Sequence, residues 1–372
     1  MRVTLCVDAL EPQPGGIGRY TWELCKGLRH HSGVSPLFFA GNQLVEEPGR
    51  LLVGEKRRTR RGLWALTYGR WRAREALRNT LVHSPNYFLP AHVETGVITV
   101  HDLSVFRYPE LHPAARVRDF ERNLQRSIDK ACHLITDCDT IRREVIEFAA
   151  IPPERVTAVP LGVSESFRPV PLERRGPALE RYGLPDNGYG LTLSTLEPRK
   201  RIDRLLSAWR RLPRPVRDRF PLAIGGAAGW NNEALHAQIR DGAAEGWLIP
   251  LGYIAESDLP AIYSGARVFA YPSVYEGFGL PPVEAMASGA PTVIAAGSCL
   301  TEVTKGAALA TNPDDIEGFA QTLLRALVDD QWRSEAISAG IQVATRYTWT
   351  RCVAETIAIY QRVNSGLRGE QQ

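Results

Sequence analysis

The chain has 372 residues, 44 % of them apolar and 23 % charged, a length and composition typical of a globular protein with two domains. No run of about 18 apolar residues occurs and the first ten residues lack the sections of a signal peptide, so we expect neither a membrane-spanning helix nor a secretion signal. The six cysteines are scattered without a C-x-x-C pair, so we expect free thiols in a reducing cytoplasm and no disulfide or zinc framework.

The net charge of +4 conceals an uneven distribution of charged residues. Residues 1–175 carry 26 Lys and Arg against 20 Asp and Glu, whereas the remainder carries 19 against 21. Ten of the basic residues lie within 49–78, interleaved with Trp and Tyr, and such a cluster favours anionic partners. We keep two interpretations: an anchor on an anionic membrane leaflet, where cations and aromatic side chains favour the interface, or an ordinary basic helix packed on the N-terminal domain.

The first 170 residues alternate short apolar runs with amphipathic stretches, a pattern that predicts an α/β domain with a parallel sheet covered on both faces. The expected strands are 2–8, 34–40, 97–100, 133–136 and 156–160, and the expected helices are 17–30, 114–131 and 140–149.

A second alternation follows the proline-rich stretch 167–177, which we interpret as a linker. Its expected strands are 190–195, 221–225, 247–251, 268–271 and 292–295, and its expected helices are 201–212, 231–241, 257–265, 282–288, 315–327 and 331–345. We therefore predict Rossmann-like domains at 1–170 and 171–349, and a C-terminal helix within 350–372 that can return to the N-terminal domain. Open parallel sheets bind ligands at the carboxyl ends of their strands, so chemistry is expected in the turns that follow strands.

The turn after the first strand contains Gly15 and Gly16, which open a helix. Glycines let the backbone approach a ligand, and a helix N-terminus offers its N–H groups to an anion. The spacing is not the dinucleotide fingerprint G-x-G-x-x-G, so an ordinary loop remains the alternative.

The turn after strand 190–195 carries Arg199 and Lys200 at the start of an amphipathic helix. Two cations at the end of a strand form a plausible diphosphate clamp. The alternative is a solvated helix start.

Residues 275–286 read YEGFGLPPVEAM and follow strand 268–271. Proline is tolerated in the first turn of a helix, so we expect a helix from about 281 with the amides of 277–280 ahead of it. Those amides and the helix dipole suit a phosphate or the hydroxyls of a sugar. Glu276 in the loop and Glu284 in the first helical turn are too far apart for an acid–base pair, but they can hold two parts of an elongated ligand. A solvated acidic loop is the alternative.

Two smaller signals follow other strands: His101 after 97–100, and Asp137 with Asp139 after 133–136. His101 would either face a ligand or have a purely structural role in the core. The D-x-D spacing can hold a divalent metal ion, but one of the two aspartates is more simply a helix N-cap, so we predict no metal site.

Taken together, these elements occur in a recognisable order. The chain resembles the retaining glycosyltransferases of the GT-B fold, in the family 4 group, and within it the bacterial mannosyl- and rhamnosyltransferases that build O-antigen. The resemblance covers nearly the whole chain through the motifs PGGIGRYTWEL, TVHDLSVFRYPE, VPLGV, LSTLEPRKRIDRLL, GYIAESDLPAIYSGA and YPSVYEGFGLPPVEAMASGAPTV.

The resemblance implies two such domains facing a central cleft, with a nucleotide-sugar donor site. Its implied catalytic residues are His101, Arg199, Lys200 and Glu276, and its implied donor-binding residues are Gly15, Gly16, Tyr253, Ile254, Gly277, Phe278, Gly279, Leu280 and Glu284. Glu276 would meet the sugar hydroxyls, Glu284 the ribose, and Tyr253 with Ile254 the base. Many relatives carry an arginine near the position of Ser194. In this chain Arg199 would also take over the phosphate contact of that arginine, or the diphosphate would be bound more weakly.

The resemblance also implies transfer with retention and without a metal or another cofactor. The acceptor hydroxyl would attack the face from which the diphosphate leaves, and cations would stabilise the leaving group. We expect transfer of a hexose, either mannose or a deoxy-mannose, with GDP-mannose as the favoured donor and a glycan or lipid-linked oligosaccharide as acceptor. We also expect a cytoplasmic enzyme peripheral at the inner face of the plasma membrane. The alternatives are a UDP- or dTDP-sugar donor, a sugar-nucleotide-binding protein without transfer, and a nucleic-acid-binding protein using 49–78, which lacks any recognition motif.

Overall fold

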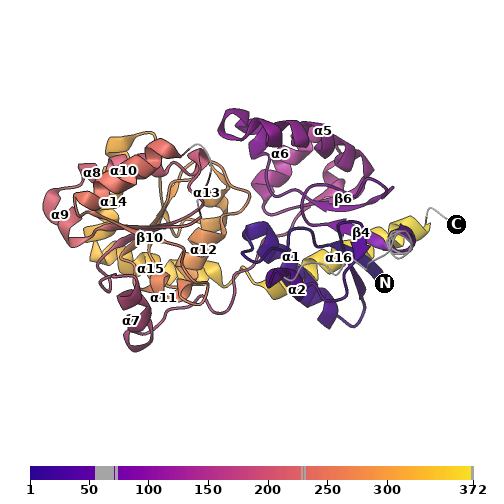
Figure 1. Cartoon of the computed structure of the whole chain (residues 1–372), viewed down its shortest axis with the longest axis horizontal. Coiled ribbons are helices and arrows are strands. Elements are labelled where there is room, and N and C mark those ends of the chain that lie inside the picture. The colour runs from indigo at the N-terminus through magenta and orange to yellow at the C-terminus, as the bar shows by residue number, and fades with distance from the viewer. Residues whose placement is uncertain (55–70, 72–73, 228, 230–231, 370–372) are drawn as a thin grey trace. The chain divides into compact units, whose positions relative to one another are not determined.

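The computed structural model describes the chain except residues 55–70, 72–73, 228, 230–231 and 370–372 (Figure 1). The chain divides into two compact units, each with its own sheet and its own core. Unit 1 comprises Met1–Leu103, Ala115–Gly162 and Trp349–Gln372, and unit 2 comprises Ser104–Ala114 and Val163–Thr348.

The sheet of unit 1 has the order β3-β2-β1-β4-β5-β6-β7 and is parallel except for the β2–β3 pair. Its strands are β1 (Arg2–Cys6), β2 (Ser35–Ala40), β3 (Gln43–Leu44), β4 (Leu81–Ser84), β5 (Gly96–Thr99), β6 (Ala131–Thr136) and β7 (Val156–Ala158). Every residue of β4 and β5 is buried, because helices cover both faces of a parallel sheet.

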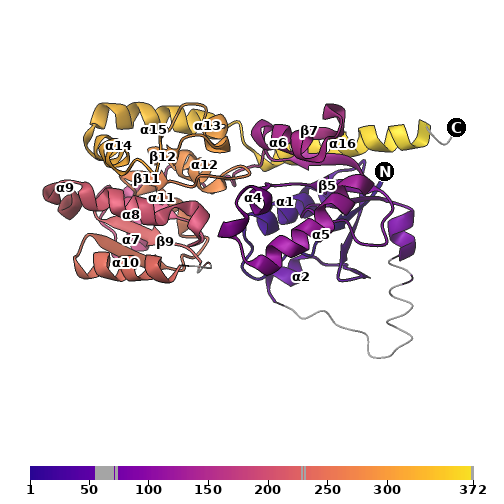
Figure 2. The ribbon, with the colours of Figure 1, turned by 90° about the horizontal axis from the view of Figure 1, so that it is seen from above.

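The helices of unit 1 include α1 (Gly16–His30), α2 (Gly49–Leu52), α5 (Ala114–Lys130), α6 (Asp139–Ala149) and α16 (Trp349–Gly369), with the 3-10 turn η2 (Pro153–Arg155). Figures 1 and 2 show α16 running along this unit. It packs on α1 at Gly27, where an added Cβ would lie 2.4 Å from a methyl group of Val353. The hydroxyl of buried Tyr360 lies 2.5 Å from Nδ1 of His83 on β4, so the C-terminal helix belongs to the core of unit 1.

The sheet of unit 2 has the order β10-β9-β8-β11-β12-β13, and all its pairs are parallel. Its strands are β8 (Gly190–Leu193), β9 (Leu222–Gly225), β10 (Leu248–Gly252), β11 (Val268–Tyr271), β12 (Thr292–Ala295) and β13 (Leu309–Thr311). The order reverses between β8 and β11, as it does between β1 and β4 in unit 1, and such reversals leave room for ligands beyond the strand ends.

Two apolar clusters fill unit 2. One includes side chains of α8, α10 and α14, with Trp209 and Phe319, and the other includes side chains of α7, α11 and α12, with Tyr263 and Phe269. The helices and 3-10 turns are α4 (Ser104–Arg107), η1 (Pro109–Leu111), α7 (Leu172–Arg181), η3 (Pro198–Lys200), α8 (Ile202–Arg211), α9 (Arg214–Arg219), α10 (Glu233–Ala244), α11 (Leu259–Ser264), α12 (Leu280–Ala287), α13 (Cys299–Thr304), α14 (Ile316–Val328) and α15 (Asp330–Ala344).

The predicted pair of parallel α/β domains is confirmed. Unit 2 starts at Val163, ahead of the predicted linker, and it also includes 104–114, which we had placed with the N-terminal domain. The interpretation of 167–177 as a linker was wrong in part, because α7 begins within it. Pro171 stands at the N-cap position and Pro177 lies inside the helix. Strand β4 was missed because its second half, His83 and Ser84, is polar, so it does not read as a continuous apolar run.

Candidate active site

The reversal of strand order in unit 2 brings the turn after β8 against the loop after β11. Lys200, the last residue of η3, forms an ion pair with Glu276, and Nη1 of Arg199 lies 3.3 Å from Oε2 of Glu276. Arg199 also donates to the carbonyl oxygen of Tyr275. Three residues that the sequence predicted for one site are therefore in contact.

Two further side chains complete this cluster and were missed by the sequence analysis. Nζ of Lys200 donates to the hydroxyl of Tyr271 at 2.9 Å, and that hydroxyl donates to Oε1 of Glu276 at 3.1 Å. Glu197 accepts a hydrogen bond from Nη2 of Arg199 at 2.7 Å. Both residues are buried. Their positions, at the end of β11 and two residues before Arg199, were the available signals.

The charges within the cluster determine what it can do. Burial alone would raise the pKa of Glu276, but Lys200 and Arg199 outweigh burial and lower it to about 2. Burial lowers the pKa of Lys200 from its ordinary value, and the neighbouring Glu276 opposes that shift. Glu276 is therefore a carboxylate at neutral pH and a weak base, which suits binding better than proton transfer.

The loop that carries Glu276 is held through its backbone. Sγ of Cys299 donates to the carbonyl oxygen of Glu276 at 2.9 Å. Gly279 has a φ of +93°, and an added Cβ would lie 2.3 Å from Cδ2 of Leu300, so glycine is required there. Helix α12 begins at Leu280, and the N–H groups of a first turn have no partner within the helix. With the positive end of the helix dipole, they suit an anionic or hydroxyl-rich ligand.

Glu284 lies in a different environment from Glu276. Because α12 begins at Leu280 instead of about 281, Glu284 is in the second turn of the helix and the expectation of the first turn was wrong. It is buried, and the hydroxyl of Tyr263 donates to its Oε2 at 3.3 Å. Glu276 thus lies among cations and Glu284 beside a phenol, and their contact with two parts of one ligand stays a prediction.

The predicted base-binding pair follows β10. Tyr253 is 69 % exposed, and its ring is open to stacking, whereas Ile254 is buried in the apolar cluster of α7, α11 and α12. A Cβ added to Gly225 would lie 2.8 Å from Cδ1 of Ile254, which shows how tightly this side chain is packed. Only the backbone of Ile254 is left for a ligand.

The glycine turn of unit 1 has open space around it. Gly15 is the N-cap residue of α1 with a φ of −69°, which any residue adopts, and an added Cβ would meet nothing within 4 Å. Gly16 is the first residue of the helix. At Gly18, by contrast, an added Cβ would lie 2.8 Å from the carbonyl oxygen of Ala9. The fold therefore requires Gly18 and leaves the role of Gly15 and Gly16 in ligand binding as a prediction.

His101 lies at the carboxyl end of β5 and is buried. Its Nδ1 lies 2.7 Å from Oδ2 of Asp137, and its Nε2 lies 2.9 Å from the carbonyl oxygen of Pro85. Asp139 is the first residue of α6 and Cys138 holds the N-cap position, so the expectation of an aspartate N-cap was wrong. Among the described residues no three His, Cys, Asp or Glu side chains are arranged to hold a metal ion.

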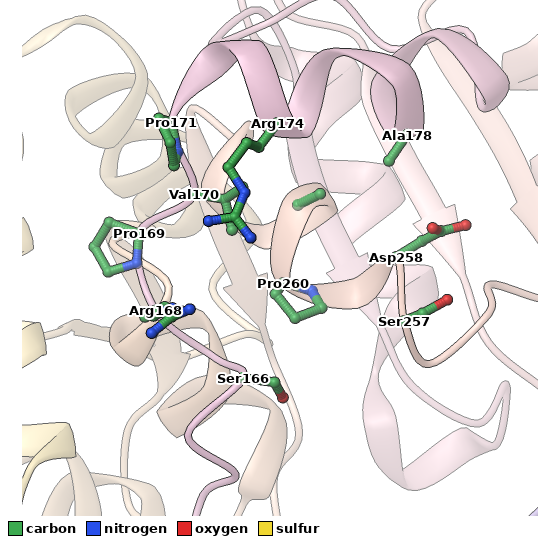
Figure 3. Close-up of a pocket in the computed structure, with 11 residues that line it drawn as sticks. Ser166, Arg168, Pro169, Val170, Pro171, Arg174, Ala178, Ser257, Asp258 and Pro260 are labelled. Atoms are coloured by element: carbon green, nitrogen blue, oxygen red, sulfur yellow. The ribbon is translucent and has the colours of Figure 1, made fainter.

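Unit 2 also contains a cavity of about 310 Å³ beside the start of α7 (Figure 3). Its lining residues are Ser166, Arg168, Pro169, Val170, Pro171, Arg174, Ala178, Ser257, Asp258, Pro260 and Ala261. None of the predicted site residues belongs to this lining, and its carboxylate, Asp258, is paired with Arg181. The cavity is therefore separate from the Lys200–Glu276 cluster in the residues that form it.

The basic segment 49–78 falls mostly on 55–70 and 72–73, outside the described residues, so its role as a membrane anchor stays a prediction. In the part of the chain that the structure describes, no helix is both long and apolar enough to cross a membrane.

Comparison with known proteins gives matches along the whole chain. Residues 14–167 match the family described as Glycosyltransferase Family 4, and residues 183–343 match the family described as Glycosyl transferases group 1. The O-antigen chain mannosyltransferase B of Escherichia coli is 35 % identical over 387 aligned positions, which cover 97 % of this chain and 100 % of the relative.

Two solved structures share the fold of the chain. Sucrose-phosphate synthase from Thermosynechococcus elongatus superposes with a TM-score of 0.75 and 19 % identity, covering 98 % of this chain and 100 % of that one. HepE from Anabaena, solved in complex with UDP and glucose, superposes with a TM-score of 0.72 and 19 % identity. The match covers 96 % of this chain and 99 % of HepE. The fold and the full-length identity to the E. coli relative lead to one conclusion: the chain belongs to the family 4/group 1 glycosyltransferases of the GT-B fold and is a glycosyltransferase.

Proposed function

We propose that the enzyme transfers mannose from GDP-mannose to a glycan or lipid-linked oligosaccharide, with retention of configuration, during O-antigen synthesis. Similarity over the whole length to an O-antigen chain mannosyltransferase supports the sugar and the pathway. The structural observation that carries the proposal is the contact of Arg199, Lys200 and Glu276 beside the start of α12. This arrangement offers cations and backbone amides to a sugar diphosphate.

In the proposed reaction the diphosphate leaves while Lys200, Arg199 and the amides of α12 stabilise its growing charge, without a metal ion. The acceptor hydroxyl attacks the face that the diphosphate leaves, forming the new C–O bond as the old one breaks, and the leaving phosphate takes its proton. Glu276, ionised and paired, binds sugar hydroxyls and is not a nucleophile. The resemblance assigns His101 and the glycines at the start of α1 to the same donor.

A UDP- or dTDP-sugar is the second candidate donor, because HepE, which shares the fold, was solved with UDP and glucose. The two other functions considered above have less support. A binding protein without transfer is disfavoured by the family, and a nucleic-acid-binding role would depend on the basic segment alone.

The direct test is a transfer assay preceded by thermal-shift screening, since a ligand that binds the folded state raises its stability. We expect GDP and GDP-mannose to raise Tm more than the UDP and dTDP compounds, and product NMR to show the donor's anomeric configuration. Activity should persist in EDTA. Transfer only from a UDP- or dTDP-sugar, or activity that needs added magnesium or manganese, would contradict the corresponding part of the proposal.

We also propose, from the sequence alone, that residues 49–78 anchor the enzyme on an anionic membrane leaflet. We expect replacement of Arg57, Arg58, Arg60 and Arg61 by serine to abolish co-sedimentation with anionic vesicles and to spare donor hydrolysis. A variant that still pellets with the vesicles at physiological salt would show that 49–78 is not the anchor.

A further inference from the structure

The environment of His101 determines its protonation. Three neighbouring parallel strands, β4, β5 and β6, end beside one another and deliver Pro85, His101 and Asp137. The ring nitrogens of His101 lie 2.7 Å from a carboxylate oxygen and 2.9 Å from a carbonyl oxygen. A carbonyl and a carboxylate only accept hydrogen bonds, so each ring nitrogen must carry a hydrogen to satisfy them. Both hydrogens can be present only on an imidazolium.

The buried His83, one strand away, provides an internal comparison. Its ring nitrogens meet the hydroxyls of Tyr360, at 2.5 Å, and Thr99, at 2.9 Å, and either hydroxyl can donate. Burial lowers the pKa of His83 to about 3, so this ring is neutral. Burial alone would also lower the pKa of His101, but Asp137 outweighs it and the pKa is raised. The two histidines differ in their partners and not in their burial.

The groups that face His101 come from every element around it. Asp137 follows β6, and Asp102 is the next residue after His101 in the chain. Both carboxylates favour the charged form of the His101 ring. His83 on β4 also lies close enough to His101 to interact with it electrostatically. The rings of Tyr20 on α1 and Tyr87 after β4 meet the imidazole edge to face at 5.3 and 5.7 Å. Burial raises the pKa of both phenols, so they stay neutral.

Two observations indicate that this arrangement is built for His101. Oδ1 of buried Asp137 has no hydrogen-bond partner among the described residues, so the ion pair through Oδ2 is the contact that orients this carboxylate. Tyr87 has a φ of +58°, a left-handed conformation that is costly for a bulky residue and persists where the surroundings enforce it. Its hydroxyl accepts from the N–H of Asp102, which ties the strained loop that carries Pro85 to the residue after His101.

We propose that Asp137 is a positioning residue that, together with the carbonyl of Pro85, holds His101 as an imidazolium with both N–H groups committed to the protein. His101 then supplies a fixed charge and cannot accept a proton as a general base. The consequence for turnover rests on the proposed function, whereas the protonation of His101 does not. The proposal also gives the first aspartate of the D-x-D pattern a purpose other than metal binding.

The test has two arms, and the first needs no enzymatic activity. The full-length protein is titrated by NMR of its histidine Cε1–H groups, with His101 assigned from the His101→Asn spectrum. We expect His101 to titrate above 6.5, the ordinary value for a histidine, and Asp137→Asn to lower its midpoint by at least about one unit. Asp139→Asn, an exposed carboxylate two residues away, is the matched control and should leave the midpoint unchanged. A wild-type midpoint at or below 6.5 would overturn the proposal whatever the variants do.

The second arm measures the pH dependence of transfer. We expect Asp137→Asn to lower kcat about tenfold at pH 8 with little change in the donor KM, and to recover activity as the pH falls and the ring regains its proton. Asp139→Asn should follow the wild-type profile. A profile for Asp137→Asn parallel to that of the wild type would reduce Asp137 to a structural role and overturn the proposal. If the wild type transfers from no nucleotide sugar, the proposed function fails, and the NMR arm alone decides the role of Asp137.

Discussion

Both sheets wind outward in two directions from a central pair of strands, but different side chains gather at their carboxyl ends. In unit 1 the strand ends carry His83, Thr99 and His101, whose partners are hydroxyls, a carbonyl and one carboxylate. In unit 2 the corresponding ends carry Lys200 and Glu276, held by direct ion pairing. The same topology therefore supports a network of neutral groups with one ion pair, and a cluster of opposite charges.

This difference determines how each unit responds to removal of a group and to acid. A buried ion pair costs little while intact but leaves an uncompensated charge when one partner is lost, so unit 2 should be sensitive to single substitutions. A buried neutral histidine resists protonation, so unit 1 should be sensitive to pH.

The largest effect should follow from Glu276→Ala, which leaves the buried Lys200 and the partly buried Arg199 without their shared carboxylate. We expect turnover to fall at least about 100-fold, and the free energy of unfolding to fall by about 3–5 kcal/mol. Transfer kinetics and urea denaturation measure the two quantities. Glu284→Ala, which removes a carboxylate outside the cation cluster, should reduce turnover less. The reverse order of the two variants would contradict the assignment of Glu276 to the sugar.

A smaller loss should follow from Lys200→Ala. Removing one charge-assisted contact to a leaving phosphate is worth about 1.5–3 kcal/mol, so turnover should fall at least about tenfold. Arg204→Ala is the matched control, because Arg204 is a partly exposed cation on the helix that follows. Near-normal turnover of the Lys200 variant would remove this residue from the reaction.

The response to acid should separate the units. The pKa of His83 is lowered to about 3 by burial, so its contribution to stability is present above its unfolded value of 6.5 and is lost as the pH falls toward 3. The lowered pKa of His133, about 4, acts in the same direction. The raised pKa of His101 stabilises the folded state, and this contribution is fully present below pH 6.5. It therefore does not reverse the loss of stability in acid. In unit 2 the pKa of Glu276, lowered from 4.5 to about 2, matters only below pH 4.5.

Between pH 7 and pH 5 we therefore expect unit 1 to lose about 2 kcal/mol through His83, while unit 2 keeps its stability. Hydrogen exchange read by mass spectrometry resolves the two units, and the amides of β4 and β5 should lose protection first. His83→Gln should flatten this dependence. Earlier loss of protection in β8 and β11 would reverse the comparison.

Much of the fold could be predicted from the sequence because buried parallel strands are continuous apolar runs, such as 268–271, separated by helical periods. The exceptions have local causes. Strand β4 ends in the polar residues His83 and Ser84, and α7 was masked by the prolines at 171 and 177. The inclusion of 104–114 in unit 2 depends on tertiary packing, which no local pattern encodes.

The site was predictable where residues follow strands, as Lys200 and Glu276 do. Pairing across strands was not predictable, because it depends on sheet order: Asp137 meets His101 only since β5 and β6 are neighbours. Tyr271 and Tyr263 were missed for a similar reason, since each acts through a residue distant in the chain. Burial also changed one assignment, because Ile254 reads as a turn residue but belongs to the core.

The smallest effect on activity should come from substitution of Tyr253, because the two units also differ in the exposure of their tyrosine rings. The tyrosines around His101 in unit 1, Tyr20 and Tyr87, are buried, whereas Tyr253 in unit 2 is 69 % exposed and contributes little to the core. If its ring stacks on the donor base, Tyr253→Ala should raise the donor KM roughly fivefold, because stacking of one base on an aromatic side chain is worth about 1 kcal/mol or more. Tyr253→Phe keeps the ring and should bind the donor normally, and neither variant should change the urea midpoint. Equal donor KM values for the alanine variant and the wild type would place the base elsewhere in unit 2.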